Sequence, residues 1–336
     1  MKLKRVELEA TGEKSIAIRE EGEWVPLISA LRALGIFRKK PYALLEEAAD
    51  DVIMFLSGGD TLRTLARDLV SSHISRKKRI PVSLRNIPLL PFQPRSYRDF
   101  MLFERHVIDA GRGYAKRFLP KSSGVLSLYE KTTGRTFPKL KPKSIWYKKP
   151  IYYMGNHLNF YPDESLIPWP SYTKALDYEC ELGIIITKPI KNASEEEAEA
   201  AIGGFTILND FSARDVQREE MESGFGPVKA KNFANAIAEV IVTPDEILPD
   251  LDNLTARVFI NGELKNEGTT AGPQHSLQKA IAYASLEEQI VPGEFMASGT
   301  IPGCSGMESG NWLQPGDILR LEIDKIGSLT STIGAP

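Results

Sequence analysis

The chain has 336 residues, of which 42% are hydrophobic and 26% are charged, so it is long enough for two ordinary globular domains. Its 42 basic and 44 acidic residues leave a formal net charge of −2, a balance that does not indicate nucleic-acid binding. No apolar run is long enough to span a bilayer, and the charged first ten residues are not typical of a signal peptide. We therefore expect a cytoplasmic protein without a membrane partner. Two cysteines, Cys180 and Cys304, are too few for a disulfide framework and are predicted to be free thiols.

The first 93 residues predict a small mixed domain. Alternating residues on either side of a polar turn at Gly22 indicate a hairpin, and helical spacing follows it. The basic run Arg76–Arg79 would suit a nucleic-acid patch or a solvated surface turn, of which we favour the turn. The proline-rich segment from Pro88 to Pro94 predicts an inter-domain linker. We therefore predict a small N-terminal domain at residues 1–93 and a larger second domain at residues 94–336.

The segment after the linker carries one histidine among apolar residues. Helical spacing from Tyr97 to Val107 predicts a helix. The two glycines that follow, Gly111 and Gly113, are expected to form the hinge of a lid. Residues 116–150 are rich in Lys, Ser, Gly and Pro and predict a loop that orders when substrate binds. Its lysines would attract an anionic substrate, although a solvated surface explains them equally well.

Three carboxylates flank two predicted strands. Side chains alternate along a strand, so Glu179 and Glu181 share a face about 7 Å apart, while Cys180 points the other way. Another apolar strand ends at Asp210. Two carboxylates on a buried strand repel each other unless a cation lies between them, whereas on a rim they would simply face solvent. Carboxylates without thiolate or imidazole companions favour Mg²⁺, Mn²⁺ or Ca²⁺ over zinc.

The rest of the chain contains clear boundary signals. Ser194 and Glu197 form a capping box for a helix, and Ser276 caps a second one. Asn261 and Gly262 predict a tight hairpin turn between two strands. A closing strand is predicted at residues 318–323.

Three strings of this sequence resemble the fumarylacetoacetate hydrolase family: RDFMLFERHV, DYECELGIII and LNDFSARDVQ, in this order. The similarity extends from near Arg98 to the C-terminus. It implies an α+β fold, in which a mixed β-sandwich or β-roll catalytic domain follows a small, partly β domain. It also implies a homodimer with active sites near the interface.

The resemblance also assigns roles to individual residues. It implies that His106 activates a water molecule and that Glu308 orients this histidine. It implies that Lys231 adds positive charge beside the metal, and that Arg214, Gln217 and Thr300 contact the substrate. The implied metal ligands are Asp99, Glu179, Glu181 and Asp210.

Two positions depart from the family pattern. The hydrolase that gives the family its name has tyrosines where this chain has Met101 and Met221. A site built for those hydroxyls would lose about 1 to 3 kcal/mol for each unmet hydrogen bond. A smaller or more apolar acylpyruvate-like acid therefore suits two methionines better than fumarylacetoacetate does.

The resemblance implies a divalent-metal-dependent hydrolase that cleaves a carbon–carbon bond in a β-diketo acid. In that reaction His106 activates water and Mg²⁺, or alternatively Mn²⁺ or Ca²⁺, stabilises the departing enolate. The same chemistry would serve a 2-keto acid decarboxylase, tautomerase or hydratase of this fold. A non-catalytic protein that binds a metal or a ligand is a further alternative.

Overall fold

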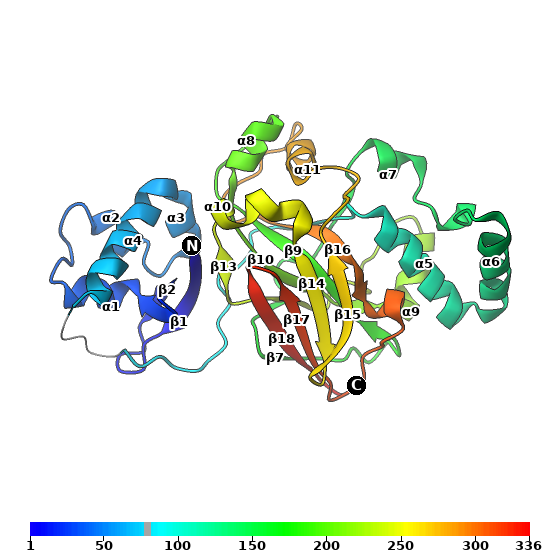
Figure 1. Cartoon of the computed structure of the whole chain (residues 1–336), viewed down its shortest axis with the longest axis horizontal. Coiled ribbons are helices and arrows are strands. Elements are labelled where there is room, and N and C mark those ends of the chain that lie inside the picture. Colours follow the sequence, from blue (N-terminus) through cyan, green and yellow to red (C-terminus); the bar gives the residue numbers. More distant parts are fainter. Residues whose placement is uncertain (77–81) are drawn as a thin grey trace.

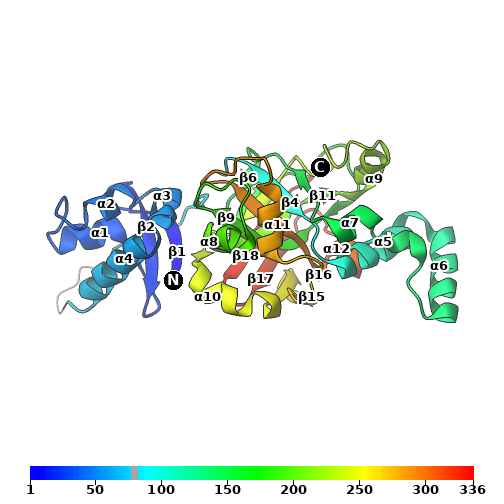
Figure 2. The same cartoon turned by 90° about the horizontal axis from the view of Figure 1, so that it is seen from above.

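The computed structural model describes residues 1–76 and 82–336, so Lys77–Arg79 of the predicted basic turn lie outside the described residues. Figures 1 and 2 both show three parts along the long axis. A small N-terminal part lies at one end, two β-sheets fill the centre, and helices α5 and α6 project at the other end. In the part of the chain that is described, no helix combines the length and the apolar character needed to cross a bilayer.

The centre is a sandwich of two sheets, which agrees with the predicted α+β fold. The large sheet has the order β3-β2-β1-β13-β10-β9-β16-β4-β5, with β12 beside β10 and β6 beside β12. The second sheet has the order β15-β14-β17-β18-β7, and β11 pairs with β8. Apolar side chains of β9, β10, β14, β17 and β18 form one buried core between the sheets. The central strands are β4 (Tyr97–Phe100), β5 (Tyr152–Met154), β6 (Phe160–Tyr161), β7 (Ser165–Ile167), β8 (Leu176–Asp177), β9 (Glu179–Ile186), β10 (Ile202–Asp210), β11 (Ser212–Ala213), β12 (Asn235–Ile237), β13 (Ile241–Val242), β14 (Thr255–Ile260), β15 (Glu263–Thr269), β16 (Phe295–Ser305), β17 (Ile318–Ile323) and β18 (Gly327–Ile333).

The N-terminal part extends the large sheet. Its strand β1 pairs with β13 in antiparallel register, Lys2 opposite Val242. Its apolar residues share a core cluster with Ile185 and Phe295 of the central sheet. The boundary after Gln93 therefore stays a proposal, because backbone pairing and packing both continue across the two parts. The elements are β1 (Lys2–Glu7), β2 (Lys14–Glu20), β3 (Glu23–Pro26), α1 (Leu27–Ala33), α2 (Ala43–Glu47), α3 (Val52–Ser57) and α4 (Gly59–Ile74).

Capping and turn residues in the sequence correctly predicted where several helices and strands begin or end. The Ser194 capping box begins α8, and the Ser276 hydroxyl accepts from the Lys279 amide at the start of α11. Asn261 and Gly262 turn between β14 and β15 with φ of 53° and 83°, as the predicted hairpin requires. The remaining helices are α5 (Glu104–Phe118), α6 (Pro120–Thr133), η1 (Pro138–Leu140), α7 (Ser144–Lys148), α8 (Glu195–Ala200), α9 (Arg214–Glu222), α10 (Pro244–Ile247), η2 (Leu248–Asn253), α11 (Leu277–Ala284) and α12 (Gly306–Ser309).

The segment that follows the linker was predicted wrongly in two ways. Residues 97–100 form the buried strand β4 rather than the first turn of a helix, because they pair with both β16 and β5. Helix α5 begins only at Glu104 and runs through Gly111 and Gly113 without a hinge. A Cβ atom on Gly113 would lie 1.7 Å from the carbonyl oxygen of Met307, so this glycine permits close packing of α5 against α12.

The predicted loop at residues 116–150 is largely helical. It contains α6, η1 and α7. Pro120 begins α6 and Gly134, with a positive φ of 64°, ends it. The Arg112 guanidinium of α5 donates to both carboxylate oxygens of Glu130 on α6 at 3.0 and 2.8 Å. Composition alone predicted a loop because the apolar positions of α6 are few and face no core.

Candidate functional site

Four consecutive strands of the large sheet, in the order β10-β9-β16-β4, bring the predicted carboxylates to one place. Glu181 on β9 lies opposite Leu208 of β10 and Thr300 of β16. Asp210 ends β10, and Asp99 of β4 lies opposite Ala297 of β16. Sheet pairing therefore gathers side chains that are up to 111 residues apart in the sequence, the separation of Asp99 and Asp210.

The carboxylates of Asp99, Glu181 and Asp210 form a buried cluster. One oxygen from each lies within 4.8 Å of the others. Each residue also keeps one oxygen without a hydrogen-bond partner among the described residues: Asp99 Oδ1, Glu181 Oε2 and Asp210 Oδ1. Burial raises the pKa of all three carboxyls, and the neighbouring carboxylates raise those of Asp99 and Glu181 well above their usual range. This donor set fits a hard divalent cation, which would relieve the repulsion between them.

The fourth predicted ligand, Glu179, lies beside this cluster and contacts two cations. The Lys231 ammonium donates to Glu179 and to Asp210, and the Arg214 guanidinium donates to Glu179 Oε1 at 2.6 Å. Burial alone would raise the pKa of Glu179, but Arg214 and Lys231 lower it below its usual range. The pKa of Lys231 is raised, since Asp210 and Glu179 outweigh the effect of burial. Glu179 is therefore ionised, and its role as a ligand stays a prediction.

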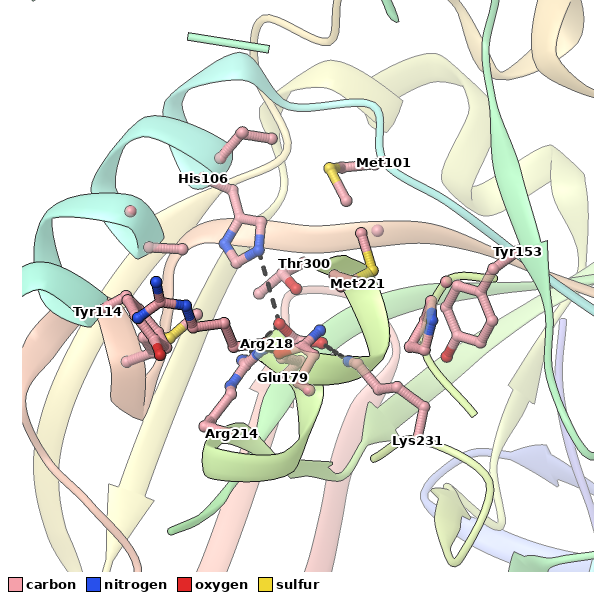
Figure 3. Close-up of a pocket in the computed structure, with 18 of the residues that line it drawn as sticks. Met101, His106, Tyr114, Tyr153, Glu179, Arg214, Arg218, Met221, Lys231 and Thr300 are labelled. Carbon is pink, nitrogen blue, oxygen red and sulfur yellow. Dashed lines mark hydrogen bonds and ion pairs between the residues drawn. The ribbon is translucent and has the colours of Figure 1, made fainter. Parts of the chain in front are cut away.

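His106 and Glu308 form a pair at the edge of the cluster. The imidazole Nδ1 lies 3.0 Å from Glu308 Oε2. Its Nε2 lies 3.6 Å from Glu179 Oε1 (Figure 3). Burial alone would lower the pKa of His106, but the carboxylates of Glu308 and Glu179 outweigh it and raise that pKa. The contact that the resemblance implied between Glu308 and His106 is thus present. A histidine held in this way has the geometry of an oriented acid–base group.

The predicted substrate-contacting residues lie in the same cavity, of about 1500 Å³. The Thr300 hydroxyl donates to Glu181 Oε1 at 3.2 Å. Arg214 is buried and donates to Asp177, Glu179 and Gln217, so its guanidinium already has protein partners. The roles of Arg214, Gln217 and Thr300 toward a substrate are therefore still predictions.

The sequence did not reveal two tyrosines and one aspartate that support the cluster. The Tyr97 hydroxyl donates to Asp99 Oδ2 at 3.0 Å, and the Tyr153 hydroxyl donates to Asp210 Oδ2 at 2.8 Å. Asp177 accepts from Arg214 Nε at 2.8 Å and from the Met307 amide at 3.0 Å, which ties Arg214 to α12. The period of two along a strand would have placed Tyr97 beside Asp99. No local signal points to Tyr153.

The comparisons with known proteins identify the family of the chain. The family model described as "Fumarylacetoacetate (FAA) hydrolase C-terminal" matches residues 131–334, more than half of the chain. The 4-hydroxyphenylacetate degradation bifunctional isomerase/decarboxylase of Escherichia coli is 31% identical over 247 residues, which cover 67% of this chain and 55% of that protein. The chain thus spans about half the length of that relative. The human mitochondrial oxaloacetate tautomerase FAHD1 is 27% identical over 222 residues, covering 66% of this chain and 91% of that protein.

Solved structures show the same fold. A fumarylacetoacetate hydrolase from the psychrophilic Exiguobacterium antarcticum has a TM-score of 0.68 and 21% identity, with all of both chains covered. The 5-carboxymethyl-2-hydroxymuconate delta-isomerase of Mycobacterium smegmatis has a TM-score of 0.58 and 17% identity, covering 99% of this chain and 98% of that one. At these identities the likeness concerns the fold alone. The family match over residues 131–334 shows that this chain belongs to the fumarylacetoacetate hydrolase family.

Proposed function

We propose that this chain is a divalent-metal-dependent hydrolase that cleaves a carbon–carbon bond in an acylpyruvate-like β-diketo acid. The observation that carries the proposal is the buried His106–Glu308 pair, in which Nε2 of His106 lies 3.6 Å from Glu179 Oε1 and the imidazole lines a large cavity. Hydrolysis requires a base directed at water, and an imidazole oriented by a carboxylate supplies one.

Asp99, Glu181 and Asp210 would hold the cation, with Glu179 as a fourth ligand. When bound, a divalent cation such as Mg²⁺ supplies Lewis-acid polarisation of the keto-acid oxygens. His106 takes a proton from water, and the hydroxide adds to the distal carbonyl carbon. The bond between that carbon and the methylene carbon then breaks, which yields a carboxylic acid and, after return of the proton, a 2-keto acid. Glu308 Oε2, which lies 3.0 Å from Nδ1, would keep a proton on that nitrogen, so that Nε2 accepts the proton from water.

A lyase or isomerase activity is the second candidate, and the names of relatives favour it. The Escherichia coli relative is named as an isomerase/decarboxylase and the human relative as an oxaloacetate tautomerase. Decarboxylation and tautomerisation use the same carboxylate cluster but do not need an activated water molecule. A non-catalytic ligand-binding protein would keep metal affinity without turnover.

A substrate panel separates these functions. Acetylpyruvate, benzoylpyruvate and oxaloacetate are each assayed with Mg²⁺ or Mn²⁺, and again after the metal is removed with EDTA. We expect metal-dependent release of pyruvate and a carboxylic acid from the acylpyruvates. Turnover of oxaloacetate alone would reject the hydrolase in favour of the second candidate, and metal binding without any turnover would favour a binding protein.

The metal site is tested directly by calorimetry. Glu181→Gln removes an anionic ligand whose Oε1 accepts a hydrogen bond from the Thr300 hydroxyl. We expect Mg²⁺ affinity to fall by at least the ~10-fold that loss of a supporting residue typically costs. Unchanged Mg²⁺ affinity in this variant would reject the cluster as a metal site.

The assembly and location of the protein also remain proposals. The family resemblance implies a homodimer that acts on a small anionic keto acid, and the cytoplasmic location stays a prediction. Light scattering at micromolar concentration tests the assembly, and a fully active monomer would contradict it.

A further inference from the structure

The outer half of the cavity is lined by exposed apolar side chains. Among the described residues, seven of the exposed large hydrophobic side chains line this one cavity. Exposed apolar side chains that gather in one place mark a binding surface, whereas single ones are ordinary. We call this set the apolar chamber: Met101, Val125, Ile151, Met154, Met221, Phe225 and Val228.

Helix α6 forms one wall of the apolar chamber. Figure 2 shows α6 projecting from the body of the molecule beside α5, and none of its residues is buried. Its position is held by the Arg112–Glu130 ion pair and by edge-to-face packing of Phe137 on Tyr129. Val125 lines the cavity and is 64% exposed, so the helix offers this apolar side chain to the cavity rather than to a core.

A glycine-flanked loop forms another wall. The Glu220 carboxylate accepts hydrogen bonds from the backbone amides of residues 228–230 at 2.7, 2.8 and 3.1 Å, which anchors the base of the loop. Gly224 and Gly226 have φ of 86° and 79°, values that favour glycine. Between them Phe225 is 91% exposed and lines the cavity. An anchored loop with an aromatic tip is suited to close onto an apolar ligand.

The size of the cavity exceeds what a small keto acid needs. Its volume is about 1500 Å³, whereas pockets for drug-sized ligands typically have about 300 to 1000 Å³. The buried charged groups Glu181 and Lys231 lie at the inner end. Four exposed charged residues also line the cavity: Lys121, Lys139, Arg218 and Glu222. In the view of Figure 3, Met101 and Met221 lie between His106 and Tyr153.

We infer that the apolar chamber binds the acyl arm of the substrate, and that this arm is a long aliphatic or aromatic group. The inference rests on the proposed function, because the keto-acid end must lie at the carboxylate cluster for the arm to reach the chamber. Continuity favours this occupant over a second copy of the chain, since one cavity joins the reacting groups to Val125 and Phe225. Selectivity for an apolar arm follows from burial of its methylene groups.

The test uses N-alkyl oxamates, which carry a carboxylate next to a carbonyl and cannot be cleaved in the proposed reaction. Their dissociation constants are measured by calorimetry with saturating Mg²⁺, for arms from methyl to octyl. Partial burial of each added methylene gives about a 2-fold gain, so we expect the octyl compound to bind at least about 30-fold more tightly than the methyl compound.

Two variants of α6 provide a matched pair. Val125 and Leu128 are both 64% exposed, but only Val125 lines the cavity. Val125→Asp should reduce the octyl-to-methyl affinity ratio to below about 5-fold, and Phe225→Ala should reduce it by a smaller factor. Leu128→Asp should keep the wild-type ratio. Circular dichroism checks that each variant is folded.

The outcomes separate this inference from the function on which it rests. If no oxamate binds in the presence of Mg²⁺, the keto-acid site itself is wrong. If methyl oxamate binds and longer arms add nothing, the site stands and the apolar chamber is not a substrate subsite. If light scattering shows that Val125→Asp, but not Leu128→Asp, converts a dimer to a monomer while the arm dependence persists, a second copy covers the chamber and the inference is overturned.

Discussion

The carboxylate cluster and the apolar chamber occupy one cavity but are built in opposite ways. The cluster lies on strands β4, β9 and β10, and its members are buried and tied to neighbours by hydrogen bonds. The chamber is formed largely by helices and loops, and its side chains are exposed. A change in the cluster therefore disturbs a buried charge network, whereas a change in the chamber alters a surface. This difference would let the chain keep one chemistry while its choice of substrate varies.

Removing the base should give the largest effect in this comparison. We expect His106→Ala to lower turnover of an acylpyruvate by about 10² to 10⁴-fold, as loss of a general base does. Glu308→Gln should also lower turnover, but by a smaller factor, because the Glu308 carboxylate orients the imidazole and does not hold the substrate. Steady-state kinetics measures both effects. Wild-type cleavage by His106→Ala would contradict the hydrolytic role.

A second comparison concerns the two projecting helices, which differ in how tightly they pack. In α5, a methyl group on Gly113 would collide with the Met307 carbonyl, whereas Gly124 of α6 has no atom within 4 Å of an added Cβ. We expect Gly113→Ala to lower the free energy of unfolding by about 1 to 3 kcal/mol. Gly124→Ala should raise it by up to about 1 kcal/mol, because alanine favours a helix. Urea denaturation measures both values, and equal effects would contradict the packing of α5 on α12.

The cluster should also depend on hydroxyls that hold its carboxylates in place. Tyr153→Phe removes the hydrogen bond to Asp210 Oδ2, so this carboxylate oxygen loses one of its donors and keeps the Lys231 ammonium. We expect Mg²⁺ affinity to fall by about 10-fold, as changes behind a metal ligand do. Tyr152→Phe is the matched control, because the Tyr152 hydroxyl lies 3.4 Å from Glu288 instead. If calorimetry gives the same Mg²⁺ affinity for both variants, Tyr153 does not support the site.

The smallest effect concerns a part-buried carboxyl outside the site. Burial raises the pKa of Asp163 to about 6, although its Oδ1 accepts from the amides of Glu164 and Thr330. The folded protein therefore binds this proton more tightly than the unfolded chain does. The resulting stabilisation is complete below the usual value of 3.8 and is lost as the pH rises through about 6.

Replacing this carboxyl tests whether the pKa of Asp163 is raised or lowered. As the pH rises from 4 to 7, the free energy of unfolding of the wild type should fall by about 1 to 2 kcal/mol more than that of Asp163→Asn. This value is reduced from the full effect of the pKa shift because Asp163 is partly exposed to solvent. Chemical denaturation at several pH values measures the difference. A wild type that gains stability over this range relative to the variant would show that the pKa of Asp163 is lowered instead.

The sequence by itself determined the features that depend on neighbouring residues. The alternation of Glu179 and Glu181, the capping box at Ser194 and the turn at Asn261 each follow from local geometry, and each is present. The family resemblance added Asp99 and the contact between His106 and Glu308, whose partners lie about two hundred residues apart.

Only the tertiary structure decided the rest, because the deciding contacts are distant in the chain. Residues 97–100 fit a helical spacing, but pairing with β16 and β5 makes them a strand. Helix α6 escaped prediction because it buries no apolar face, which is the signal that periodicity detects. Tyr153 reaches Asp210 only after β5 joins the sheet, and the apolar chamber exists only where α6 and the Phe225 loop face the same cavity. Local propensity describes each segment alone, whereas a site depends on which segments the fold brings together.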